Sequence, residues 1–200
     1  MVSFKKTLLL AMASSAQSSP VSDKTTVAVA QGFTPHAVPA GAIDISNNIA
    51  LIDEMKKKHG LEPAKDGQMT VMGGACNQGT CPDFDKAFDM MYTWTQITTP
   101  GEGGAPPTTL VWNDFVVRVN DCGKCYSHRV GSTHGGCYDF TACNRPQQIC
   151  VDDGHNRAHR IWKDKNHKTC YRISQIGYGG CGPVKARVIF RPDGETACNW

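Results

Sequence analysis

Apolar residues first recur at helical spacing between residues 45 and 55. Ile45, Ile49, Ile52 and Met55 are three or four residues apart, which places their side chains on one face of a helix. Asp44 or Ser46 can cap the start, three lysines at 56–58 suit the negative end of the helix dipole, and Gly60 can end it. The pattern predicts a helix over about 46–59.

A second helical pattern follows Pro82, a residue typical of the first helical turn. Phe84, Ala87, Phe88 and Met91 share one face at helical spacing, and acidic residues at 83 and 85 suit the helix N-terminus. We expect a helix over about 82–95 that packs on a sheet.

Beyond residue 109 the pattern changes to short runs rich in β-branched and aromatic residues, which are typical of strands. The expected strands are 110–119 in two halves about Asn113-Asp114, 148–151, 159–162, 169–176 and 184–190. The third and fourth would form a hairpin with a six-residue loop. The expected fold class is α+β: a small disulfide-rich antiparallel β domain with at least one packed helix, preceded by a flexible leader and a short helix.

The N-terminus predicts export. Lys5 and Lys6 precede a short apolar run at 8–13, and the small residues at 14–16 suit cleavage, so residues 1–16 are predicted to be a signal peptide. Residues 17–75 are rich in Ser, Thr, Pro and Gly outside the predicted helix, and are expected to be a leader or propeptide-like segment. Residues 76–200 would form the globular domain, located outside the cell, in a host apoplast or within a host cell.

The cysteine residues also indicate an exported protein. All ten lie in the last 125 residues, at Cys76, Cys81, Cys122, Cys125, Cys137, Cys143, Cys150, Cys170, Cys181 and Cys198. An even number in an exported domain predicts five disulfides of unknown pairing, each of which typically stabilises by ~2–4 kcal/mol.

Two other interpretations of these cysteines stay open. Cys122, Cys125, His128 and His134, with the cysteines at 137 and 143, have residue types and spacings that zinc uses. The Cys122-Gly-Lys-Cys125 motif also has the spacing of redox-active pairs. Disulfides are the favoured interpretation, so neither a metal nor a cofactor is expected.

Charge is concentrated near the C-terminus, although the whole chain carries only +3. Nine basic residues lie between His155 and Arg191, opposed by Asp164 alone. A basic, aromatic face suits an acidic partner. The predicted binding residues are His155, Arg157, His159, Arg160, Trp162, Lys163, Lys165, Lys168, Arg172, Lys185 and Arg187.

The segment G-P-V-K-A-R-V-I-F at 182–190 is similar to a loop and strand of guanyl-type ribonucleases and ribotoxins. The resemblance implies a phosphate-contacting role for Arg187. The final histidine of that family has no counterpart in R-P-D-G-E-T-A-C-N-W at 191–200, so the resemblance implies a relative without activity.

The whole chain, with its export signal, leader and cysteine-rich domain, resembles secreted cysteine-rich effectors of plant-associated fungi. This resemblance implies a virulence-type protein that acts by binding and has no assigned catalytic residue. The expected partner of such a monomer is a host protein, an anionic polysaccharide or another acidic surface, with nucleic acid less favoured and no transmembrane segment. The alternatives are a ribonuclease-like protein and an antimicrobial or killer-toxin-like protein.

Overall fold

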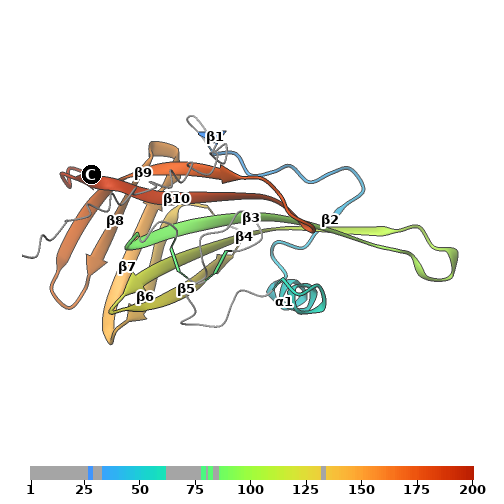
Figure 1. Cartoon of the computed structure of the whole chain (residues 1–200), viewed down its shortest axis with the longest axis horizontal. Coiled ribbons are helices and arrows are strands. Elements are labelled where there is room, and N and C mark those ends of the chain that lie inside the picture. The colour runs from blue at the N-terminus through green and yellow to red at the C-terminus, as the bar shows by residue number, and fades with distance from the viewer. Residues whose placement is uncertain (1–26, 29–32, 62–77, 80, 83–85, 132–133) are drawn as a thin grey trace, which may run out of the picture.

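The computed structural model describes residues 27–28, 33–61, 78–79, 81–82, 86–131 and 134–200. Within these residues, ten strands form one curled sheet, and one α-helix lies beside it (Figure 1). The elements are β1 (Val27–Ala28), β2 (Ile43–Asp44), α1 (Ile49–Lys58), β3 (Phe88–Thr99), the 3-10 helix η2 (Glu102–Gly104), β4 (Thr108–Asp121), β5 (Lys124–Gly131), β6 (Gly136–Ala142), β7 (Arg145–Asp152), the 3-10 helix η3 (Asp153–His155), β8 (Arg157–Trp162), β9 (His167–Tyr178) and β10 (Val184–Thr196).

The strand order is β2-β4-β3-β10-β9-β8-β7-β6, with β5 added beside β4 and β1 beside β9. The β2–β4 pair is parallel and the other pairs are antiparallel, so the sheet is mixed. Strands early and late in this order contribute to one apolar cluster. The sheet is therefore curled into a half-barrel, with this cluster on its inner face. That cluster contains Phe88, Met90, Tyr92, Trp94, Val111, Phe115, Val117, Val119, Ile149, Val151, Ala158, Tyr171, Ile173, Val188 and Phe190.

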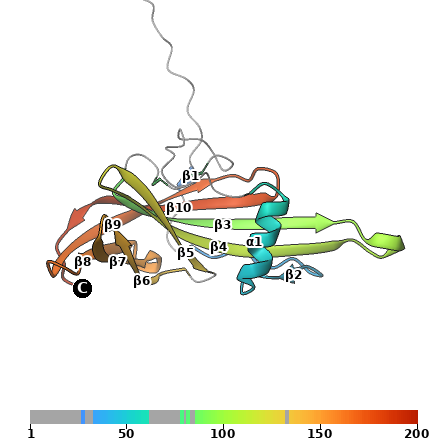
Figure 2. The same cartoon turned by 90° about the horizontal axis from the view of Figure 1, so that it is seen from below.

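A second, smaller cluster lies on the other face of β3 and β4, where α1 packs (Figure 2). Ile52 and Met55 of the helix contact Ile97 and Trp112 of the sheet. Helical spacing therefore predicted α1 correctly, although the helix begins later than expected, with Asn48 as its N-cap. Ile49 is half exposed and does not belong to the buried face.

The predicted helix at 82–95 is wrong, because Phe88–Thr99 forms β3 at the centre of the sheet between β4 and β10. Residues on both faces of β3 are buried, so its apolar positions do not alternate with polar ones. A strand buried on both faces can be mistaken for a helix when only spacing is considered. The sequence of β3 is rich in aromatic and Thr residues, which favour β-strands.

The α+β fold class is consequently also wrong. The described chain is mostly β, and α1 is its one α-helix. The predicted strands are present but longer: 110–119 lies within the unbroken β4, β8 and β9 are joined by four residues instead of six, and β10 continues through Arg191-Pro192-Asp193-Gly194-Glu195.

Four disulfides join described residues: Cys81–Cys125, Cys122–Cys143, Cys137–Cys150 and Cys170–Cys198. Cys181 is disulfide-bonded as well. The prediction of a disulfide-rich domain is therefore confirmed for this part of the chain. Cys76, the predicted signal peptide and much of the predicted leader lie outside the described residues.

Candidate functional site

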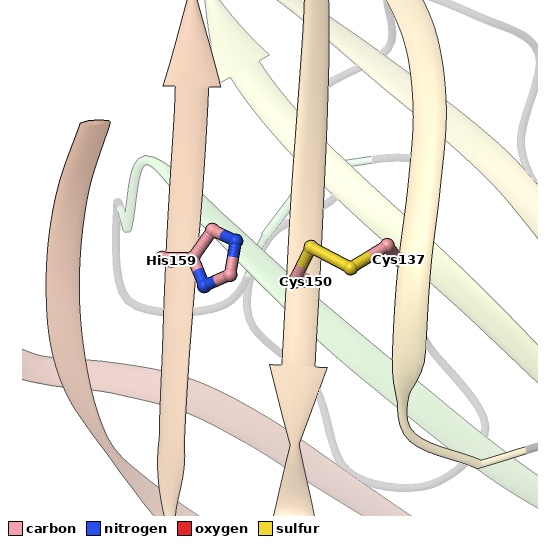
Figure 3. Close-up of side chains that lie close together, drawn as sticks. All are labelled: Cys137, Cys150 and His159. Atoms are coloured by element: carbon pink, nitrogen blue, oxygen red, sulfur yellow. A yellow bond between two sulfur atoms is a disulfide. The ribbon is translucent and has the colours of Figure 1, made fainter. Parts of the chain in front are cut away.

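The outer face of β6–β9 presents a row of residues in direct register. Cys137 pairs with Cys150, Cys150 with His159, and His159 with Cys170 across successive antiparallel strands. Directly paired residues of neighbouring antiparallel strands point to the same face. Figure 3 shows His159 beside the Cys137–Cys150 disulfide.

The C-terminal segment is held against this row by the Cys170–Cys198 disulfide. Two residues further on, the indole ring of Trp200 lies with its centroid 4.5 Å from the Arg157 guanidinium carbon and 5.2 Å from the Lys168 ammonium. The Lys168 ammonium also donates a hydrogen bond of 2.8 Å to the backbone oxygen of Trp200. The His159 ring is 5.2 Å from the indole. We call Arg157, His159, Lys168 and Trp200 the Trp200 cluster.

Asp152 orients the cation at one side of the cluster. Its carboxylate accepts a 2.8 Å hydrogen bond from Nε of Arg157 and lies 2.9 Å from Nδ1 of His155. Partial burial alone would raise the pKa of Asp152, but the hydrogen bonds from His155 and Arg157 outweigh it, and the pKa is lowered. Asp152 therefore stays ionised and fixes the direction of the Arg157 side chain.

His159 lies in a less hydrated position. Burial, followed by the charge of Lys168, lowers its pKa below the ordinary value. Its Nδ1 is buried and has no hydrogen-bond partner among the described residues. At neutral pH the imidazole is therefore uncharged, and the positive charge of the cluster comes from Arg157 and Lys168.

An open pocket of about 530 Å³ adjoins the cluster. His159 and Trp200 line one part of it, and His134 and Asp153 line another. Nδ1 of His134 is 2.8 Å from the buried Asp153 carboxylate, which orients the imidazole. The pocket wall also contains Gly135, Gly136, Cys137, Cys150, Val151, Asp152 and Gly154.

Arg160, although it follows His159, points to the inner face and is 3% exposed. Its guanidinium donates to the side-chain oxygen of Gln147 and, over 2.9 Å, to Asp121. Burial lowers its pKa, and the nearby Asp121 opposes that shift. Trp162 packs against the Arg160 guanidinium at 4.5 Å. Arg160 is therefore an interior residue and not part of the predicted outward surface, while Trp162 is partly buried and also lies 5.5 Å from the ring of the exposed His167.

The remaining predicted residues, apart from Arg172, are dispersed over the molecule. Lys163 forms an ion pair with Asp139, Lys165 is exposed in the turn after β8, and Lys185 donates to the backbone oxygen of Gly182. Arg187 donates from Nε to the Thr93 hydroxyl over 3.1 Å. Arg172 is exposed and pairs in register with Arg157, so it extends the cationic face of the Trp200 cluster.

The cysteines of the predicted metal and redox motifs are bonded to other partners. Cys122 and Cys125 pair with Cys143 and Cys81, not with each other. Sulfur, nitrogen and oxygen atoms do approach within 4.8 Å in two groups, Cys137-Cys150-His159 and Asp121-Cys122-Cys143. In each group both sulfurs belong to a disulfide and supply no thiolate ligand.

Trp200 is the cluster residue that sequence reasoning missed. The available signal was its position two residues after Cys198, since a disulfide at that cysteine would hold the following aromatic residue against the domain.

No protein-family model, curated protein or solved structure matches this chain. Among the described residues, no helix is long and apolar enough to cross a membrane.

Proposed function

We propose that this chain is an exported cysteine-rich binding protein of the effector type, and that the Trp200 cluster binds an acidic polysaccharide of a host or cell surface. The observation that supports this proposal is the contact of one indole ring with two cations, Arg157 and Lys168. The binding surface is thus narrower than the basic stretch from His155 to Arg191.

The chemistry of the cluster suits a sugar that carries carboxylates. An aromatic ring offers a flat apolar surface against which a sugar ring can pack, and Arg and Lys side chains pair with carboxylates. Arg157 is held in direction by Asp152, so less side-chain freedom is lost on binding. The adjacent pocket gives room for a second sugar unit beside His159.

Export is supported by the disulfides. Four bridges in one small domain are characteristic of proteins that fold in an oxidising compartment. They also favour persistence outside the cell, because cross-links limit the unfolded states that proteases attack.

The proposal is tested by titrating the protein with oligogalacturonate, and with a neutral glucan oligomer of the same length, by calorimetry. We expect saturable binding of the acidic oligomer only, weakened at least about tenfold by Trp200→Ala and by the double variant Arg157→Ala/Lys168→Ala. The matched control is Lys57→Ala/Lys185→Ala, which removes two exposed charges elsewhere. Equal weakening in the two double variants would mean that net charge, not the cluster, drives binding.

Two further assays separate the alternatives. Turnover of RNA by the intact protein, lost in Arg187→Ala or His159→Ala, would favour the ribonuclease-like alternative over the binding proposal. Inhibition of microbial growth that strengthens at low salt, without binding to the acidic oligomer, would favour the antimicrobial alternative.

A further inference from the structure

Residues 33–42 cross the inner face of the curled sheet, and Phe33 is inserted among aromatic side chains there. The ring of Phe33 meets the rings of Tyr92 and Phe190 edge to face, with centroids 4.6 and 5.1 Å away. The Phe115 ring is 6.4 Å away in the same kind of arrangement. These rings come from β3, β4 and β10, so the site for Phe33 is formed by the sheet itself.

His36 makes the second attachment. Its backbone N–H donates to the Tyr92 hydroxyl over 3.0 Å, and its Nδ1 lies 3.3 Å from the same oxygen. The imidazole is nearly parallel to the rings of Tyr92 and Trp94, at centroid distances of 6.1 and 5.9 Å. The Tyr92 hydroxyl donates its own proton to the side-chain oxygen of Asn113, so its oxygen is available to accept the hydrogen bond from His36.

The rest of this segment is attached weakly. Residues 36–41 are exposed, and the nearest strand pairings lie on either side of the segment, at β1 with β9 and at Ile43 opposite Leu110 in β2–β4. Between Phe33 and Ala42, the described contacts include no pairing of backbone strands. The segment is therefore held at Phe33 and at His36, three residues apart, and not as a strand of the sheet.

The sequence of the segment has the character of a peptide ligand. In F-T-P-H-A-V-P-A, at 33–40, Pro35 and Pro39 fix their own backbone angles and favour an extended form of the residues before them. Extended proline-containing peptides commonly dock in grooves lined by aromatic residues, since little conformational freedom is lost on binding.

We propose that the aromatic groove formed by Tyr92, Trp94, Phe115 and Phe190 is a peptide-binding site, and that residues 33–42 occupy it as an intramolecular ligand. The partner is an extended, proline-containing peptide with an aromatic side chain and, three residues later, an imidazole or other planar group. This site is on the inner face, whereas the Trp200 cluster is on the outer face. His134 lies between them, since its ring is 6.0 Å from the Phe33 ring and it also lines the pocket beside the cluster.

An intramolecular ligand competes at a high effective concentration, so it lowers the apparent affinity for a peptide in solution. Residues 33–42 also belong to the segment predicted to be a leader or propeptide. Its removal or displacement would open the groove to a partner.

The test uses a fluorescent synthetic peptide with the sequence of residues 31–42 and the full chain. Phe33→Ala/His36→Ala should bind this peptide at least about tenfold more tightly than the unaltered protein, because the competitor has lost both attachments. A peptide with Phe replaced by Ala should bind weakly. Adding Tyr92→Phe to the double variant removes the hydroxyl that His36 uses and should reduce the affinity again.

A second measurement covers the case in which the double variant does not fold. A protease site introduced into the exposed residues 38–41 allows the otherwise unaltered chain to be cut after folding. The cut segment should then exchange with excess labelled peptide. If the cut protein keeps its own segment and takes up no peptide, or if the folded double variant does not bind the peptide, Phe33 is a permanent part of the core and the proposal is wrong.

Discussion

Cys122 and Cys143 lie in two turns at opposite ends of the strand order, and their disulfide joins these turns. Cys122 follows β4, where β5 is added to the sheet, and Cys143 follows β6, the last strand of the order. Both residues have a positive φ, 51° and 55°, which few residues other than glycine adopt readily. The bridge thus holds the two edges of the curled sheet together over the core.

Removal of this bridge should open that closure. We expect Cys122→Ala/Cys143→Ala to lower the free energy of unfolding by ~2–4 kcal/mol, because a constraint over 21 residues is lost from the unfolded chain. Chemical denaturation measures the loss. Hydrogen exchange should accelerate in β5 and β6 and remain slow in β3.

The matched control is Cys137→Ala/Cys150→Ala, which removes a bridge between strands that seven register pairs already join. Exchange in β5 should not change in this control. Equal acceleration of β5 in both variants would contradict a specific closing role for Cys122–Cys143.

Arg157 and Arg160 are three residues apart and have opposite roles. Arg160→Met should cost about 3 kcal/mol of unfolding free energy, since it leaves the buried Gln147 and the Asp121 carboxylate without their cation. Arg157→Met should cost less than about 1 kcal/mol, because its ion pair with Asp152 is about one-third exposed. Urea denaturation of the two variants checks this difference, and similar losses would contradict it.

These two arginines also show what sequence patterns could and could not predict. The sequence of 157–162 indicates a strand whose side chains alternate between two faces. It does not indicate which face of β8 is covered by the other edge of the sheet. That depends on Asp121 and Gln147, which are 39 and 13 residues away from Arg160. The basic stretch was therefore recognised correctly as an unusual concentration of charge, while its division into an interior residue and a surface cluster required the tertiary fold.

The same limit explains the error at β3. Spacing is sufficient to identify α1, where only one face is buried against Ile97 and Trp112. Around Phe88–Thr99, burial on both sides removes the period that distinguishes a strand from a helix. Pairings such as Val188 with Tyr92 join residues almost a hundred positions apart, and a single sequence contains no local signal for them.

Asp114 connects α1 to the sheet. Its carboxylate pairs with Lys56 of the helix and, over 2.6 Å, with Nε of Arg129 in β5, and only 5% of its side chain is exposed. Asp114→Ala should lower the free energy of unfolding by about 3 kcal/mol, since the half-buried Arg129 keeps its charge without this partner. Amide exchange in 49–58 should accelerate. Asp53→Ala, which removes the exposed carboxylate from the same arginine, should cost less than about 1 kcal/mol; an equal loss would contradict a special role of Asp114.

The lowered pKa of His159 predicts how binding at the Trp200 cluster depends on pH. Burial and Lys168 disfavour the charged imidazole, so it remains neutral until the pH falls below its ordinary pKa of about 6.5. A bound polyanion would stabilise the protonated form and raise this pKa, and by linkage protonation must then strengthen binding.

We expect the affinity for oligogalacturonate to rise as the pH is lowered from 7 to 5, while the galacturonate carboxylates remain largely ionised. His159→Gln should bind with a weaker dependence on pH over this interval, whereas His155→Gln, which changes the exposed imidazole beside Asp152, should retain most of the rise. The same shift has the opposite consequence for the free protein, whose stability should fall as the pH is lowered through the folded-state pKa, because the unfolded chain binds the proton more readily. If calorimetric titrations at several pH values give parallel curves for His159→Gln and the unaltered protein, His159 does not contact the polyanion.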